Sequence, residues 1–230
     1  MTSKAFLSCN EAIADVFDGA TIMFGGFITA GTPTDLVQAL VERDTSNITG
    51  IANNIGIGDP LDNLCEKRQL RKMIASFAIR ASGARQSRFE EQYRAGEVEL
   101  ELVPQGTLAE RIRAGGAGIG GFYTPTGVGT VVAEGRETRI IDGREHLFEL
   151  PLRADFAFIK AHRGDTSGNL VYRRAERNFN VTMATAADIV IAEVEELVET
   201  GELEPEAIVT PGIYVDRIVK GERHEARWYP

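Results

Sequence analysis

The segment from residue 20 to residue 52 constrains the fold more than any other part of the chain. It opens with Ala-Thr-Ile-Met-Phe at residues 20–24, an apolar run bounded by glycines that is typical of a strand covered on both faces. A glycine-containing stretch, residues 25–31, follows. Thr32 and Pro33 then predict a helix start, with Thr32 as the N-cap and Pro33 in the first turn. A strand at residues 48–52 completes a strand, loop, helix, strand order, which predicts a parallel sheet.

The rest of the chain continues this alternation. Further strands are expected at residues 72–77, 98–103, 154–161, 189–192 and 213–219. Further helices are expected at residues 11–16, 61–71, 88–95 and 107–113, the last with Thr107 as its N-cap. Asp142-Gly143 separates two strand-like segments, which predicts an antiparallel hairpin over residues 136–150. The predicted fold is therefore α/β, with a mostly parallel central sheet flanked by helices and a small antiparallel hairpin insert.

Length and charge limit the domain count and the class of partner. With 230 residues, the chain is expected to form a single α/β domain over residues 1–220, followed by a C-terminal tail, residues 221–230, that contains Trp228. There are 25 Lys and Arg residues against 34 Asp and Glu residues, giving a net charge of −9. Because no basic run is present, binding to nucleic acid or to an anionic membrane is not expected.

Targeting, redox and metal signals are weak. No apolar run approaches the ~18 residues of a membrane span, and the N-terminus lacks the apolar stretch of a signal peptide, so a cytoplasmic protein is expected. Two cysteines, Cys9 and Cys65, rule out a disulfide scaffold. The three histidines are far apart in the sequence, which argues against a histidine metal cluster: His146, His162 and His224.

Glycine accounts for 24 residues, and many of them fall in two groups. In the second group, residues 116–121 form a literal G-x-G-x-x-G. A dinucleotide-binding fingerprint follows a strand and opens a helix. Here a helix-like segment precedes the glycines and Pro125 follows them. We interpret the group as a helix C-cap and a tight loop.

The first group, Gly25, Gly26 and Gly31, has the context that a ligand loop needs. Glycine allows the backbone to approach a ligand closely. Free N–H groups at the start of the following helix, together with the helix dipole, would form an anion site. From this pattern alone, ligand contact and a purely structural turn are equally open. The net negative charge implies that an anion would be held by local donors.

Candidate catalytic groups are few. The sequence contains no G-x-S-x-G elbow and no Walker lysine. A run of carboxylates is interpreted as a solvated face: Glu193, Glu195, Glu196, Glu199 and Glu202. Cys65 is interpreted as a small buried residue. His162 is the best lone titratable candidate, although a structural hydrogen bond is favoured over catalysis. The residues thus predict a ligand-cradling loop without an evident nucleophile and base.

Several separate motifs occur in an order that matches one family. They are DGATIMFGGFITAGTP at residues 18–33, NNIG at 53–56, VPQGTLAERIR at 103–113, GGAGIGGFYTPTGVGT at 115–130, RNFN at 177–180 and TPGIYV at 210–215. Over about residues 10–220 the chain resembles the family I coenzyme A transferases, in their A (alpha) subunit. The likeness is strongest to A subunits that act on 3-oxoacids or 3-oxoadipate.

This resemblance implies an enzyme that moves CoA from an acyl-CoA, such as succinyl-CoA or acetyl-CoA, to a 3-oxoacid or another short carboxylate. The family works by a ping-pong route through a glutamyl-CoA thioester. Its glutamate lies in a Ser-Glu-Asn-Gly motif of the B subunit, which this chain lacks, so no catalytic residue is expected here. Glu199-Thr200-Gly201 is interpreted as surface. The resemblance also implies a B-subunit partner in an A2B2 assembly, with CoA as a substrate and no permanently bound cofactor or metal.

The resemblance also implies site residues. The loop expected near CoA and the oxyanion comprises Gly25, Gly26, Phe27, Ile28, Thr29, Ala30 and Gly31. Neutral amides are expected to line the substrate cleft: Asn53, Asn54 and Gln105. The sequence leaves the acyl donor and the acceptor acid undetermined. Two other functions stay open, namely a non-catalytic ligand-sensing or regulatory domain of related fold and a stand-alone hydrolase or lyase that uses His162.

Overall fold

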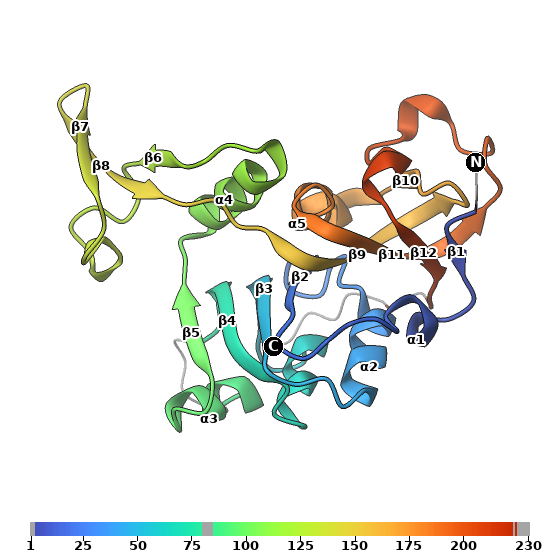
Figure 1. Cartoon of the computed structure of the whole chain (residues 1–230), viewed down its shortest axis with the longest axis horizontal. Helices are drawn as coiled ribbons and strands as arrows, with labels where there is room; N and C mark the ends of the chain where they lie inside the picture. Colours follow the sequence, from blue (N-terminus) through green and yellow to red (C-terminus); the bar gives the residue numbers. More distant parts are fainter. Residues whose placement is uncertain (1–2, 80–84, 223, 225–230) are drawn as a thin grey trace.

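A nine-stranded sheet forms the centre of the protein in the computed structural model, which describes residues 3–79, 85–222 and 224 (Figure 1). Its strands are β1 (Ala5–Phe6), β2 (Thr21–Phe24), β3 (Ile48–Asn54), β4 (Leu70–Phe77), β5 (Glu99–Leu102), β9 (Ala154–Asp165), β10 (Leu170–Val171), β11 (Ala187–Val198) and β12 (Arg217–Lys220). The order is β1-β12-β11-β9-β2-β3-β4-β5, with every pairing parallel, and β10 joins β9 antiparallel. The predicted, mostly parallel sheet is confirmed.

Helices cover both faces of the sheet. They are α1 (Cys9–Ala12), α2 (Thr34–Glu42), α3 (Arg88–Arg94), α4 (Gln105–Ala117) and α5 (Asn178–Met183). Shorter 3₁₀ helices span Pro60–Cys65, Val131–Ala133, Arg174–Arg177, Pro205–Ala207 and Gly212–Tyr214. Figure 1 shows α1, α2 and α3 on one side of the sheet and α4 and α5 on the other. None of these helices in the described ranges is long and apolar enough to cross a bilayer.

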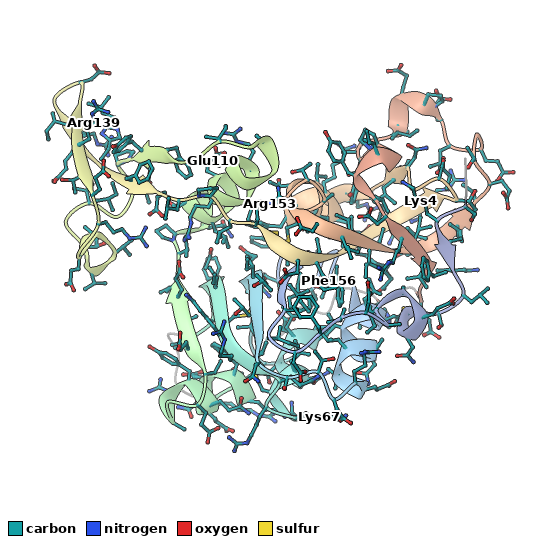
Figure 2. All side chains as sticks on the ribbon, in the orientation of Figure 1. Lys4, Lys67, Glu110, Arg139, Arg153 and Phe156 are labelled. Carbon is teal, nitrogen blue, oxygen red and sulfur yellow. The ribbon has the colours of Figure 1, made fainter. Side chains whose placement is uncertain are left out.

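Side chains along the central strands alternate between two hydrophobic cores. On β2, Ile22 and Phe24 belong to the core beneath α1, α2 and α3, whereas Met23 belongs to the core beneath α4 and α5. On β9, Phe156 and Ala157 alternate in the same way, and Figure 2 shows Phe156 in the interior. A strand buried on both faces needs apolar residues at every position, which explains the uninterrupted apolar run at residues 20–24.

A second, small sheet projects from this body (Figure 1). It consists of β6 (Phe122–Thr124), β7 (Thr138–Ile141) and β8 (Arg144–Glu149), in the antiparallel order β6-β8-β7. Asp142 and Gly143 form the turn between β7 and β8, both with positive φ. The predicted hairpin insert is therefore confirmed, with β6 as an additional strand.

Several predicted element ends are wrong. Residues 61–71 form the 3₁₀ helix Pro60–Cys65 and then the start of β4, because Leu70 already pairs with Ile48. Helix α4 begins before Thr107, so that residue is not its N-cap, and the helix runs on through Gly115 and Gly116. It ends at Gly118, which is left-handed with φ 69° and confirms the predicted C-cap.

The elements at the two ends of the chain also differ from their predicted ranges. The first helix is α1, four residues long and earlier than the predicted residues 11–16. The last strand, β12, is shorter than the predicted residues 213–219 because Gly212–Tyr214 is a 3₁₀ helix. Trp228 lies outside the described residues. Residues 221, 222 and 224 are described and contact the body, as shown below.

The strand order predicts a crevice at the carboxyl end of β2. From β2 the chain winds outward through β3, β4 and β5, and it then returns to β9 on the other side of β2 before winding outward through β11 and β12. Connections that leave two neighbouring parallel strands in opposite directions open a crevice at their carboxyl ends, where ligands bind in open α/β sheets. Residues 25–31 follow β2 at this point.

Candidate active site

The carboxyl ends of three strands bring the predicted site residues together. The glycine loop, residues 25–31, follows β2, Asn53 and Asn54 end β3, and Gln105 opens α4 just after β5. Gln105 Nε2 donates to Asn53 Oδ1 at 2.6 Å, and Asn53 Nδ2 donates to Asn54 Oδ1 at 2.9 Å. Asn54 in turn bonds Ile28 of the loop. The structure thus joins the amides and the loop in one hydrogen-bonded row.

The loop has a defined conformation. Phe27 and Ala30 exchange two backbone hydrogen bonds of 3.0 Å, which leaves Ile28 and Thr29 at the tip. Ile28 has φ 56°, a left-handed conformation that β-branched residues avoid. Asn54 holds it there, because its Oδ1 accepts from Ile28 N at 2.7 Å and its Nδ2 donates to Ile28 O at 3.1 Å. A strained residue that is fixed in this way is typical of functional sites.

The loop also carries unused backbone donors. Gly26 and Gly31 are both buried, and neither N–H group has a hydrogen-bond acceptor among the described residues. Buried N–H groups without a partner are rare in folded proteins. At the end of a strand beside a crevice, two such groups could bind a carboxylate or a developing oxyanion.

The predicted anion site at the start of the following helix is wrong. Glu193 Oε2 accepts hydrogen bonds from the N–H groups of Asp35 and Leu36, at 2.9 and 3.0 Å, so the chain's own carboxylate occupies this position. The helix begins at Thr34, with Pro33 rather than Thr32 at the cap position. An incoming anion would therefore use the loop donors and not the helix start.

Glu193 is not part of a solvated face, as the acidic run suggested. It is 0% exposed, and its Oε1 lies 2.5 Å from Lys160 Nζ. Strand β11 continues to Val198, so the alternation of the strand turns Glu193 inward. Burial raises the pKa of the Glu193 carboxyl, and the neighbouring Lys160 ammonium opposes that rise. The Glu195 side chain is also largely buried, at 8% exposed, against the prediction. Glu196, Glu199 and Glu202 are exposed as predicted.

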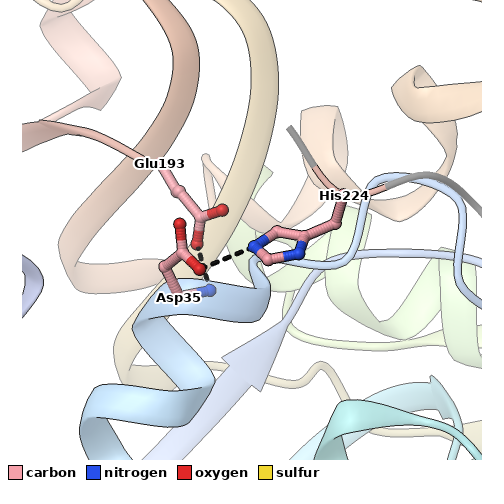
Figure 3. Close-up of side chains that lie close together, drawn as sticks. All are labelled: Asp35, Glu193 and His224. Atoms are coloured by element: carbon pink, nitrogen blue, oxygen red, sulfur yellow. Dashed lines mark hydrogen bonds and ion pairs between the residues drawn. The ribbon is translucent and has the colours of Figure 1, made fainter. Parts of the chain in front are cut away.

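Asp35, Glu193 and His224 meet at this helix start (Figure 3), with one potential ligand atom of each within 4.8 Å of the others. Asp35 Oδ1 lies 2.6 Å from His224 Nε2, and Asp35 Oδ2 accepts from the N–H of Glu222 at 2.6 Å. Each of these carboxylate oxygens already has a partner within the chain. We therefore assign the group to capping the helix and holding Glu222 and His224 against it. The expectation that the chain has no metal site stays a prediction.

Sequence reasoning missed Asp59, which lies beside the amide row. Its Oδ1 accepts from Leu61 N at 3.0 Å, and Asn54 Nδ2 donates to its Oδ2. Asp59 is only 6% exposed, and burial raises its pKa to about 7, although the two hydrogen bonds oppose the rise. It lines a small pocket at the foot of the loop with Gly25, Gly26, Ile28, Asn53 and Asn54. In the sequence, Gly58-Asp59-Pro60 has only the pattern of a turn.

His162 and Cys65 have structural surroundings. His162 Nδ1 lies 3.0 Å from Glu195 Oε2, and the other oxygen of Glu195 accepts from Arg173 at 2.9 Å. This ion-pair arrangement agrees with the structural role favoured for His162. Cys65 is buried as predicted, and burial raises the pKa of its thiol to about 12. Neither residue lines the pocket at the foot of the loop.

Comparison with known proteins decides the family. The coenzyme A transferase family model matches residues 6–221. This chain belongs to the coenzyme A transferase family. It is 52% identical over 220 residues to the A subunit of 3-oxoadipate CoA-transferase from Pseudomonas putida, covering 95% of this chain and 94% of the relative. It is 50% identical over 227 residues to the A subunit of succinyl-CoA:3-ketoacid coenzyme A transferase from Xanthomonas campestris pv. campestris, covering 98% and 92%.

The fold is shared more widely. The crystal structure of glutaconate coenzyme A-transferase from Acidaminococcus fermentans superposes with a TM-score of 0.85 over 96% of this chain and 76% of that one, at 20% identity. The family resemblance and the fold class expected from the sequence are both confirmed.

Proposed function

We propose that this chain is the A subunit of a two-subunit CoA-transferase that moves CoA from an acyl-CoA, succinyl-CoA in the first instance, to a 3-oxoacid. The observation that carries the proposal is the identity of about half of all residues, over nearly the full length, with A subunits named for these substrates. A site that has oxyanion donors and amides but no assigned nucleophile supports the same function.

In this proposal the nucleophile is a glutamate of the B subunit. Its carboxylate attacks the thioester carbonyl, CoA leaves as a thiolate, and an acyl-glutamyl anhydride forms. The thiolate then attacks the glutamyl carbonyl, which gives the glutamyl-CoA thioester and releases the first acid. The second acid receives CoA by the reverse steps. The N–H groups of Gly26 and Gly31 would stabilise the oxyanion of each addition.

The amide row would orient the acyl group. Asn53, Asn54 and Gln105 offer hydrogen bonds without a net charge. A fixed positive charge at this place would stabilise the resting glutamate and weaken it as a nucleophile. Neutral amides avoid that cost. CoA enters only as a substrate in this scheme, and no permanently bound cofactor is required.

We also propose an A2B2 assembly in the cytoplasm. The projecting sheet and the 3₁₀ helix Val131–Ala133 between β6 and β7 expose large apolar side chains, Ile140 and Val131, which is typical of a surface that meets another chain. Figure 2 shows Arg139 of β7 far from the body, on this projection. Both cysteines are free thiols, which suits a reducing compartment.

Co-expression with a B subunit tests the function. The purified mixture is expected to transfer CoA from succinyl-CoA to 3-oxoadipate or acetoacetate, and the panel of acids identifies the preferred acceptor. Borohydride reduction after treatment with acyl-CoA is expected to modify a glutamate of the B subunit. Full activity of this chain alone, or modification of Glu199 or any other residue in it, would contradict the proposal.

A further inference from the structure

Asn180, on α5, lies against the glycine loop, and its side chain makes four hydrogen bonds, the longest from Nδ2 to Asn178 Oδ1 at 3.4 Å. It is fully buried. Its Oδ1 accepts from the backbone N–H of Lys160 on β9 at 2.9 Å. Its Nδ2 donates to Gly31 O at 2.9 Å and to Glu176 O at 2.8 Å. Both amide protons and the amide oxygen are therefore used, which fixes the orientation of the side chain.

Both ends of the glycine loop fit closely around this amide. A Cβ atom at Gly25 would overlap Asn180 Oδ1, and a Cβ atom at Gly31 would lie 2.8 Å from Asn180 Nδ2. Gly31 also has φ 73°, a conformation that favours glycine. Two glycines six residues apart are thus required by one side chain, at the residue where the loop begins and at the residue where it ends.

A second asparagine of the same helix holds the loop as well. Asn178 Nδ2 donates to Ala30 O at 2.9 Å. Asn54 holds Ile28 from the other side of the loop, as described above. The carbonyl groups of three positions near the end of the loop, Ile28, Ala30 and Gly31, are therefore bound by side-chain amides. Ala30 O and Gly31 N belong to one peptide plane, so the bond from Asn178 also fixes the direction of the Gly31 N–H, which has no acceptor among the described residues.

We infer that Asn180 is a positioning residue for CoA transfer, which sets the glycine loop so that its free N–H groups face the reacting carbonyl. The inference rests on the proposed function. Asn180 would act through the loop, because its own polar atoms are all bound within the chain. Donors that serve the transition state more than the bound substrate lower kcat more than they raise KM when they are displaced.

Asn180→Asp separates this role from simple packing. The carboxyl group keeps the shape of the amide and can still accept from Lys160 N, but when ionised it turns a second acceptor toward Gly31 O and Glu176 O. When protonated it can donate one hydrogen bond to either carbonyl. In the complex with the B subunit we expect a kcat about 100-fold below wild type at pH 8. We expect part of that loss to be regained, relative to wild type, at pH 6.

Gln69 provides a matched control. It is also buried, and its Nε2 donates to three backbone carbonyls, those of Leu40, Arg43 and Thr45, beyond the opposite end of the sheet. Gln69→Glu introduces the same chemistry and is expected to lower stability while the kcat of the folded complex stays at the wild-type value. If Asn180→Asp does not fold, Asn178→Ala removes only the hydrogen bonds of the Asn178 side chain, including the one to Ala30 O, and is expected to lower kcat about tenfold.

Hydrogen–deuterium exchange gives a readout that does not depend on activity. In the complex, residues 25–31 are expected to exchange faster in Asn180→Asp than in wild type, and Gln69→Glu is expected to leave them unchanged. A wild-type kcat at pH 8 for Asn180→Asp, in a mixture whose wild type is active, would overturn the inference alone. An inactive wild-type mixture would overturn the proposed function. Unchanged exchange of residues 25–31 would overturn the hold of Asn180 on the loop in either case.

Discussion

At the scale of single residues, the candidate site depends on a few uncharged or neutralised polar groups that are largely shielded from water. Asp59 is the instructive case. It is buried beside Asn54 and Leu61, whose hydrogen bonds favour the carboxylate, yet burial outweighs them and raises its pKa to about 7. Through Asn54 the carboxyl group supports the strained backbone of Ile28. Its protonation is therefore linked to both stability and loop geometry.

This pKa predicts a pH dependence of stability. Between pH 4 and pH 7 the native state keeps the proton of Asp59 and the unfolded chain has lost it, so the free energy of unfolding falls as the pH rises. A shift of about three pH units corresponds to up to about 4 kcal/mol. Relative to wild type, Asp59→Asn is expected to gain stability with rising pH in urea unfolding at pH 4 to 8. For the control Asp44→Asn, at an exposed carboxylate, the curve of unfolding free energy against pH is expected to run parallel to that of wild type. A parallel curve for Asp59→Asn would contradict the raised pKa of Asp59.

Residues differ in how far the sequence alone predicts them. The glycine loop, Asn53, Asn54 and Gln105 lie in short motifs next to predicted strand ends, so local pattern and family resemblance are sufficient. Glu193 bonds Asp35, which is 158 positions away in the sequence, and Asn180 bonds Gly31, which is 149 positions away. Nothing in a short sequence window indicates such contacts, and an acidic run is more often solvated. Only the packing of β11 against the start of α2, and of α5 against the loop, reveals them.

At the scale of elements, predictions succeed where local chemistry decides the boundary. The αL glycine after α4 and the Asp-Gly turn between β7 and β8 are local signals, and both are confirmed. The helix predicted over residues 61–71 is wrong because the pairing of Leu70 with β3 overrides the helical pattern. The prediction for the start of α2 is wrong for a related reason, because the N–H groups there are capped by Glu193 of β11, a strand that is distant in the sequence.

Because Glu193 caps α2 and pairs with Lys160 in the interior, we expect breaking this ion pair to lower the free energy of unfolding. Lys160→Met leaves the Glu193 carboxylate buried without its cation, and we expect a loss of about 3–5 kcal/mol in the free energy of unfolding. Adding Glu193→Gln is expected to recover part of that loss, because the amide oxygen can still accept from the helix start. Urea denaturation of both variants measures this. Lys67→Met, at an exposed pair, is expected to cost less than about 1 kcal/mol. An equally small loss for Lys160→Met would contradict the stabilising role of the buried Lys160–Glu193 pair.

At the scale of the whole molecule, the proposed chemistry decides where the two subunits meet. The proposed oxyanion donors follow β2 in this chain, and the proposed nucleophile belongs to the B subunit, so in this proposal the partner covers the carboxyl edge of the sheet. That edge exposes apolar side chains at three neighbouring positions: Phe27 and Ile28 in the loop, Phe77 at the end of β4 and Leu102 at the end of β5. Exposed apolar groups that cluster in this way mark an interaction surface.

Phe77 allows a test of this orientation. Its side chain is 59% exposed at the end of β4, so Phe77→Glu is expected to leave the stability of the isolated chain nearly unchanged. Burying the new charge against the B subunit would weaken the complex by about 10- to 100-fold in Kd. Titration with the B subunit measures the affinity, and because the loop is intact, a saturating excess of that partner is expected to restore most of the activity. Ile213→Glu is the control, since Ile213 is 85% exposed but belongs to the 3₁₀ helix before β12, whose Gly212 bonds Asn169 and not the glycine loop. Equal effects of the two substitutions would contradict a partner seated over the glycine loop, because Asn54, which holds that loop, pairs with Phe77 and not with Ile213.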